Sequence, residues 1–159
     1  MKYSHKLSDA VHIMAYIEIC KGQTLSSSEI AKSINSNPSL VRRLMMYLTR
    51  GGLLVTQKGV AQPILARDSI EISLFDIYSA ITDEHNLLHV DDKTNPNCLV
   101  GGNIQSVLEV EYSKIQNAAE SEMKKISLKS IIDGILVRND YMTTCSGNPK
   151  YQHLSFSNH

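Results

Sequence analysis

The chain has few of the residues that mark disulfide-rich proteins. Among its 159 residues there are only three cysteines, Cys20, Cys98 and Cys145, and no C-x-x-C spacing. An odd number of cysteines without that spacing argues against a disulfide framework and fits a reducing cytosol. The length allows one domain, or a small domain with an extension.

Long apolar runs and enzyme motifs are lacking as well. No apolar run approaches the ~18 residues that span a bilayer. Charges interrupt the N-terminal stretch MKYSHKLSDAVHIM, so it does not have the pattern of a signal peptide. The chain contains no GxSxG, P-loop, Rossmann or HExxH motif. These absences predict a soluble, cytoplasmic protein that is not an enzyme and has no cofactor.

The net charge of zero conceals an asymmetry between the two halves of the chain. Residues 1–67 contain nine Lys/Arg and three Asp/Glu, a net charge of +6. Residues 68–159 contain seven Lys/Arg and thirteen Asp/Glu, a net charge of −6. The basic half predicts a surface that faces a polyanion, and the acidic half is expected to face away from it.

The most informative stretch is residues 26–52, SSSEIAKSINSNPSLVRRLMMYLTRGG. Ser26 and Glu29 have the S-x-x-E spacing of a capping box, which predicts the start of a helix. The short polar residues after this helix favour a turn. Asn37 before Pro38 then predicts a second start, because asparagine caps a helix and proline needs no N–H partner at the first helical position. The stretch therefore predicts two short helices joined by a tight turn.

The second of these helices is expected to run from Pro38 to Arg50 with one apolar and one basic face. The apolar positions are Leu40, Val41, Leu44, Met45 and Leu48, and the opposite ones are Ser39, Arg42, Arg43, Met46, Tyr47 and Arg50. Gly51-Gly52 ends the helix, and two β-prone runs around Lys58-Gly59 predict a hairpin with a basic tip. This order is that of a winged helix, a mainly α fold with a small β-hairpin wing.

Further helices are expected on both sides of this unit. A first helix, capped by Ser8, precedes it, and a fourth begins at Ser73. Residues 103–126 predict a long helix, and a last helix follows Ser127. The expected organisation is a winged helix-turn-helix domain at 1–82, a connecting loop at 83–102, dimerisation helices at 103–138 and a mobile or partner-draped tail at 139–159.

The long helix carries an apolar stripe that predicts a second subunit. Its residues are Ile104, Leu108, Tyr112, Ile115, Ala119, Met123 and Ile126. Their spacing averages about 3.7 residues, the period of an α-helix. A helix about 36 Å long exceeds what a small winged helix covers by itself. The same helix of a second copy is therefore the expected partner.

Three segments together resemble one family of bacterial winged-helix regulators. They are KLSDAVHIMAYI at 6–17, LSSSEIAKSINSNPSLVRRLMMYLTRGGLL at 25–54 and LLHVDDKTNPNCLVGGNIQ at 87–105. Over roughly residues 1–136 the chain is similar to the Rrf-two family, and within it to the members without a metal cluster. The iron-sulfur members place three cysteines in the loop before the long helix. This chain has only Cys98 there, too few thiolates for such a cluster.

The resemblance implies a transcriptional regulator, with repression expected, that binds a two-fold symmetric site on double-stranded DNA as a homodimer. The family's recognition-helix contacts correspond here to Pro38, Ser39, Leu40, Arg42 and Arg43. The arginine that the family's wing places in the minor groove corresponds to Lys58. Arg42 and Arg43 are the expected base readers, and Ser28, Ser39, Gln57 and Lys58 are expected to contact phosphates, which position a protein without specifying sequence.

The loop before the long helix contains the candidate sensor, Cys98. Oxidation of its thiol beside the dimer helix would shift the two DNA-reading units. The alternative is a small buried hydrophobe, which the lack of a basic neighbour in the sequence favours. A small molecule or a protein remains an open alternative as the effector.

Two other interpretations stay open. The basic face of the second helix is also usual for a solvated helix surface, and some winged helices bind proteins and not DNA; the +6 charge of residues 1–67 argues against both. His85 and His89 have the i, i+4 spacing of half a metal site. Val90 and the turn residues nearby favour loop histidines, so no metal site is expected.

Overall fold

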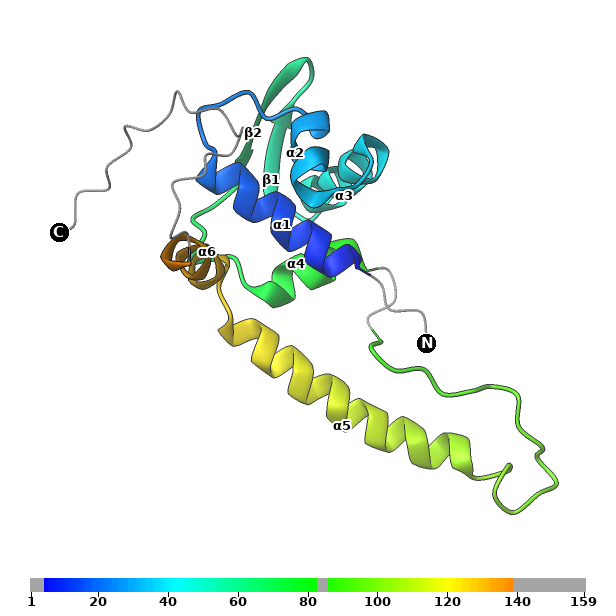
Figure 1. The fold of residues 1–159 in the computed structure, drawn as a ribbon. Coiled ribbons are helices and arrows are strands. Elements are labelled where there is room, and N and C mark those ends of the chain that lie inside the picture. Colours follow the sequence, from blue (N-terminus) through cyan, green and yellow to red (C-terminus); the bar gives the residue numbers. More distant parts are fainter. Residues whose placement is uncertain (1–4, 83–85, 139–159) are drawn as a thin grey trace.

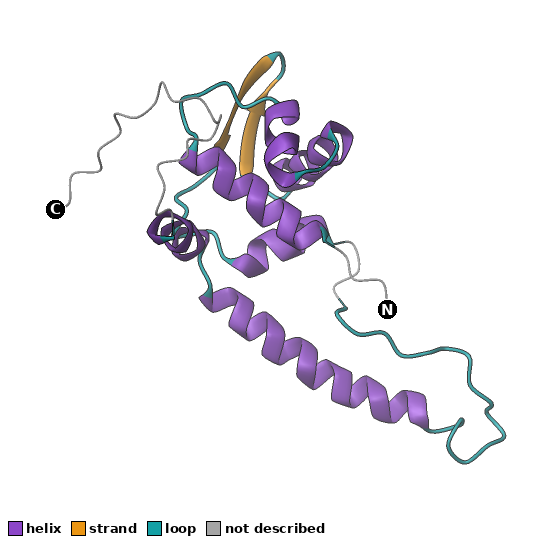
Figure 2. Cartoon of the chain, viewed as in Figure 1, coloured by secondary structure: helices purple, strands orange, loops and turns teal. Residues whose placement is uncertain are grey.

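The structure is a computed structural model that describes residues 5–82 and 86–138. The described residues form six helices and one hairpin; five of the helices and the hairpin make up a head, from which the long helix α5 projects (Figure 1). In chain order the elements are α1 (Lys6–Ile19), α2 (Ser27–Ile34), α3 (Pro38–Arg50), β1 (Leu54–Gln57), β2 (Val60–Leu65), α4 (Leu74–Ile81), α5 (Ile104–Lys125) and α6 (Leu128–Val137). The mainly α fold with a β-hairpin wing is confirmed, as Figure 2 shows.

The core of the head is built chiefly from α1, α3 and α4. Ile13 and Ile17 of α1 are buried against Leu44 and Leu48 of α3, and Ile77 of α4 belongs to the same cluster. Burying each such side chain stabilises the fold by about 1.5–3 kcal/mol relative to leaving it exposed. The apolar face of α3 is therefore fixed toward the core, and its basic face is turned outward.

Side-chain caps set the starts of α2 and α3. Ser26 Oγ accepts a hydrogen bond from the Glu29 N–H at 3.2 Å, and Asn37 Oδ1 accepts one from the Leu40 N–H at 2.8 Å. The reciprocal half of the expected capping box does not form at α2, because the Glu29 carboxylate pairs with Lys32 at 2.9 Å. The complete box forms instead at α4, between Ser73 and Asp76.

The expected Ser8 cap is wrong. The first helix, α1, already begins at Lys6, and its N-cap His5 makes no side-chain capping bond. Ser8 lies inside the first turn, where its hydroxyl cannot serve as an N-cap. The burial of Ala10 and Ile13 fixes this helix more strongly than a cap would, since tertiary packing usually contributes more to helix stability than local signals do.

The wing is an antiparallel hairpin in which Leu54 pairs with Leu65. Its two-residue turn contains Gly59 at φ +81°, a backbone region that glycine enters at low cost. The Leu25 N–H donates to the Ala61 carbonyl at 2.8 Å, which ties the start of β2, near the tip of the hairpin, to the segment before α2. The wing is thereby held next to the helix-turn-helix.

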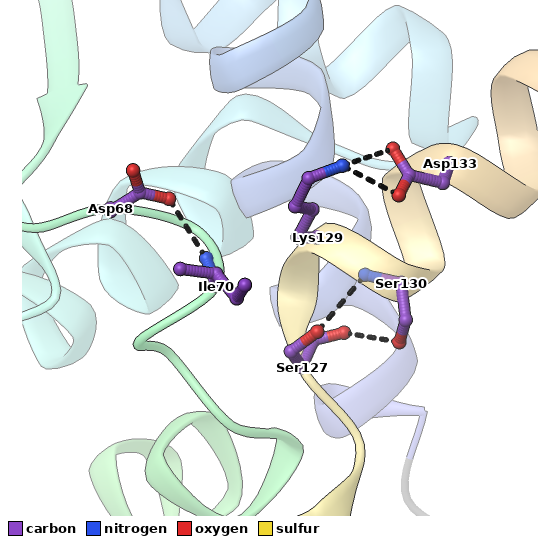
Figure 3. Close-up of polar contacts among 6 residues, drawn as sticks. All are labelled: Asp68, Ile70, Ser127, Lys129, Ser130 and Asp133. Carbon is purple, nitrogen blue, oxygen red and sulfur yellow. Dashed lines mark hydrogen bonds and ion pairs between the residues drawn. The ribbon is translucent and has the colours of Figure 1, made fainter.

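The joint between α5 and the head is a short backbone ladder. Leu74 N–H donates to the Ile126 carbonyl, and Leu128 N–H donates to the Ile72 carbonyl, both at 2.8 Å. Figure 3 shows the start of α6 at this joint, where Ser127 Oγ accepts from the Ser130 N–H at 3.1 Å. The position of α5 relative to the head is therefore fixed by backbone hydrogen bonds.

The loop before α5 is only partly described, and the tail lies outside the described residues. The expected connecting loop is described from residue 86 and contains turns but neither helix nor strand up to residue 103. The predictions for the tail at 139–159 and for His85 lie outside the described residues. None of the helices in the described part of the chain combines the length and the apolar character that crossing a bilayer requires.

Candidate nucleic-acid interface

The outer face of α3 is basic and open to solvent. Arg42, Arg43 and Arg50 are exposed along it. Figure 1 shows that α2, α3 and the hairpin lie on the side of the head away from α5. The helix α3 therefore presents three guanidinium groups outward, on the side of the head away from α5.

Two hydroxyl groups hold Arg42. Its Nη1 donates to Ser27 Oγ at 3.2 Å, and its Nη2 donates to Ser39 Oγ at 3.1 Å. The first bond reaches the first turn of α2, so the guanidinium bridges the two helices of the helix-turn-helix. Arg43 makes no hydrogen bond with any other described residue, so its guanidinium can extend toward a ligand without breaking one.

A groove of about 640 Å³ separates α3 from the wing. Its polar lining comes from Ser27 and Arg42 on one side and from Thr56 and Gln57 on the other. Its apolar lining includes Met46. The groove thus combines charged and hydrogen-bonding groups with an apolar surface in one hollow.

The tip of the wing extends the basic surface. Gln57 and Lys58 are both exposed there, next to the turn at Gly59. The pairing of Gln57 with Val60 fixes the residues of the tip to the end of the two-stranded ladder. Lys58 is therefore carried on a short rigid hairpin and not on a long mobile loop.

The other predicted DNA-contacting residues differ in exposure. Ser28 and Ser39 are exposed in the first turns of α2 and α3. Pro38 is partly buried, and Leu40 packs against the core. Leu40 therefore has less free surface for a ligand than the sequence pattern indicated.

Four residues of this surface were missed by the sequence prediction of the site. They are Ser27, Met46, Arg50 and Thr56, all of which line the groove. Met46 and Arg50 lie on the exposed face that the helical pattern had defined, so that signal was available. Ser27 and Thr56 reach the groove only through the packing of α2 and the wing around α3.

The long helix α5 is unpartnered over much of its surface. None of its own residues is buried. The preceding loop runs along one side of it, where the Leu87 N–H donates to Gln116 Oε1 at 2.8 Å. On the side left open, Val107, Val110 and Ile115 are 55%, 57% and 49% exposed.

The open face of α5 differs in part from the predicted stripe. The stripe residues Ile104, Leu108, Tyr112, Ala119, Met123 and Ile126 are only partly buried, and Ile115 is exposed. Val107 and Val110 were not predicted, because they stand off the stripe on the helix. Val107 and Val110 form an open apolar surface because the loop before α5 covers a different side of the helix, at Gln116.

The thiol of Cys98 is free and exposed in the turn before α5. The alternative of a small buried hydrophobe is therefore wrong. The backbone N–H groups of Gly101 and Val100 donate toward its sulfur and lower the pKa of the thiol. The turn is tight, since a Cβ on Gly101 would lie 2.4 Å from the Asn95 carbonyl oxygen. A thiol held in this way has raised thiolate character at neutral pH.

Cys20 lies at the C-terminal end of α1, where it is buried in the core. It is disulfide-bonded, which the spacing of the cysteines did not predict. The spacing rule concerns cysteines that are near in sequence and carries no information on distant ones. Cys20 therefore does not count among the reduced thiols that the sequence led us to expect.

The family of the chain follows from comparison with known proteins. Residues 3–134 match the model of the Rrf2 (Rrf-two) family, which is described as an iron-dependent transcriptional regulator. The chain belongs to the Rrf2 family. It is therefore a member of a family of transcriptional regulators and not of enzymes.

Individual relatives agree with this membership. YwnA of Bacillus subtilis (strain 168), assigned as an HTH-type transcriptional regulator, is 34% identical over 128 residues, which are 80% of this chain and 95% of YwnA. A crystal structure of a protein assigned to DNA binding is 34% identical, with a TM-score of 0.66 over 80% of this chain and 98% of its own. IscR of T. potens shares the fold at 20% identity, with a TM-score of 0.62 over 85% of this chain and 88% of its own.

The residues of this Rrf2 chain do not fit the iron of the family description. The loop before α5 holds a single cysteine, Cys98. Among the described residues there is no group of three or more His, Cys, Asp or Glu side chains that could hold a metal ion. An iron-sulfur cluster takes up to four thiolate ligands.

Proposed function

We propose that this Rrf2 protein is a sequence-specific repressor that binds a two-fold symmetric DNA site as a homodimer in the cytoplasm. The observation that carries the proposal is the outward face of α3, where Arg42, Arg43 and Arg50 are all exposed beside a wing tipped by Lys58. The basic, solvent-exposed face of a second helix in a helix-turn-helix is what enters the major groove of DNA. The relative YwnA, assigned as an HTH-type regulator, supports the same role.

The proposed contacts to DNA fall into two groups, those that read base edges and those that bind phosphates. An arginine can donate two hydrogen bonds to guanine O6 and N7, which discriminates bases by about 1–3 kcal/mol. Arg43 has no competing hydrogen bond among the described residues, so we assign it first to this task, with Arg42 beside it. Ser28, Gln57 and Lys58 are assigned to phosphates.

Dimerisation supplies the two-fold symmetry. The open face of α5 carries Val107, Val110 and Ile115, which a single chain leaves exposed to water. Covering apolar surface stabilises an association by roughly 25 cal/mol per Å² before the costs of binding are subtracted. Two copies of α5 packed through this face would join two winged-helix units in one two-fold assembly.

The test begins with selection of bound duplexes from a pool of random sequences by the purified protein. Recovery of one enriched two-fold motif is expected. Binding to that motif should then weaken steeply with salt, with a log–log slope near −5 if about six phosphates are contacted. No enriched motif, together with a flat salt response, would contradict DNA binding and favour the alternative of a protein-binding winged helix.

Release by oxidation of Cys98 is the proposed signal. Its thiol is exposed and has a lowered pKa, both of which favour reaction with peroxide to a sulfenic acid. Affinity for the selected motif is expected to fall after peroxide treatment of the wild type and to stay constant in Cys98→Ser. If both proteins respond alike, the signal does not act through Cys98, and a small effector takes precedence.

A further inference from the structure

Met46 is an apolar side chain in the middle of the basic face of α3. It is 40% exposed, although it is a large hydrophobic residue on a helix with a well-filled core. Arg42 and Arg43 lie about one turn before it and Arg50 lies one turn after it, so it stands between guanidinium groups. A basic surface that serves only to attract phosphates would not require an apolar group at its centre.

The helix geometry keeps Met46 away from the core. Leu44 and Leu48 lie two residues to either side of it and are buried at 1% and 0% exposure. Residues two apart lie about 200° apart around an α-helix. Met46 therefore points almost directly outward, along the line on which α3 would approach a ligand, and it also lines the groove beside the wing.

We propose that Met46 reads the 5-methyl group of thymine in the major groove. The surrounding arginines select a polyanion, and a duplex offers a single kind of apolar group at the base edges of its major groove, the methyl of thymine. A flexible, polarizable thioether side chain is suited to pack against such a group. The proposal rests on the proposed DNA binding and adds one specificity element to it.

The test uses the motif selected by the wild-type protein and replaces its thymines by deoxyuridine one at a time. This change removes only the methyl group and keeps base pairing and charge. Because burying one methyl-sized group is worth about 0.8 kcal/mol, each recognised thymine is expected to contribute about fourfold to affinity. The wild type should lose about that factor at one thymine or more in each half-site.

Variants at Met46 separate this role from a general effect. Met46→Ala should bind the thymine and deoxyuridine duplexes equally well, whereas Met46→Leu, which keeps an apolar side chain, should retain the discrimination. Val137→Ala, an exposed apolar residue on α6, is the control and should leave the discrimination unchanged. Thermal unfolding of each variant verifies that the fold is intact.

The outcomes distinguish this inference from the function on which it rests. Specific binding by the wild type with no deoxyuridine effect at any thymine would overturn the role of Met46 and leave DNA binding in place. An equal deoxyuridine effect in Met46→Ala and in the wild type would also overturn it. Failure of the wild type to bind any duplex would instead overturn the proposed function itself.

Discussion

Replacing Lys58 by alanine tests whether the wing tip contacts a phosphate. Lys58 is exposed at the turn of the hairpin, and in a homodimer the change removes two charges from the bound surface. Each phosphate neutralised on B-DNA contributes about 0.9 to the log–log salt slope, so the slope should fall in magnitude by about 1.8. Between about 50 and 200 mM salt, a dimer with six contacts loses roughly 2,000-fold in affinity, and one with four contacts roughly 150-fold.

Fluorescence anisotropy on a labelled duplex at several salt concentrations measures this slope. Lys93→Ala is the matched control, because it removes the same charge from an exposed position in the loop before α5. The control should keep the wild-type slope. An unchanged slope in Lys58→Ala, or an equal reduction in both variants, would refute the assignment of the wing tip to phosphate.

Three further predictions concern stability and assembly. Gly51→Ala should lower the free energy of unfolding by about 1–3 kcal/mol in urea titrations, because the added Cβ would lie 2.6 Å from the Ala80 Cβ; wild-type stability would contradict this packing. Val110→Glu should convert the proposed dimer to monomer in sedimentation velocity while Ser113→Glu does not, and a dimer that survives Val110→Glu would exclude this face. Although the His12 side chain is exposed, partial desolvation of its ring lowers the pKa of the imidazole below its ordinary value of 6.5, so the stability it contributes should be lost as the pH falls below that value. His12→Gln should lose less stability between pH 7.5 and pH 5, and an equal loss would refute this linkage.

Local signals predicted the helix-turn-helix well. The bounds of α3, Pro38–Arg50, follow from the cap at Asn37 and from the two glycines after the helix, because these residues act on their own backbone neighbours. The start of α1 was misplaced, since it depends on core packing more than on a cap. The Glu29 carboxylate pairs with Lys32, three residues after it, and not with the Ser26 N–H, three residues before it, which a capping box would require.

The sequence pattern did not predict contacts between segments that lie far apart in the chain. The bond from Arg42 to Ser27 joins residues on two helices, and no periodicity of either helix specifies it. Val107 and Val110 form part of the open face of α5 only because the loop lies on the other side of that helix. The lowering of the Cys98 pKa likewise comes from backbone N–H groups in a folded turn, whereas the sequence shows only the absence of a basic neighbour.

The most direct test of the central claim is the specificity ratio of an Arg42→Ala/Arg43→Ala double variant. The ratio compares affinity for the selected motif with affinity for a scrambled duplex of equal length, at one salt concentration. If α3 reads bases, the double variant should lose at least tenfold in this ratio, since each bidentate contact to guanine is worth about 1–3 kcal/mol. A ratio equal to that of the wild type, with the fold intact, would contradict the account.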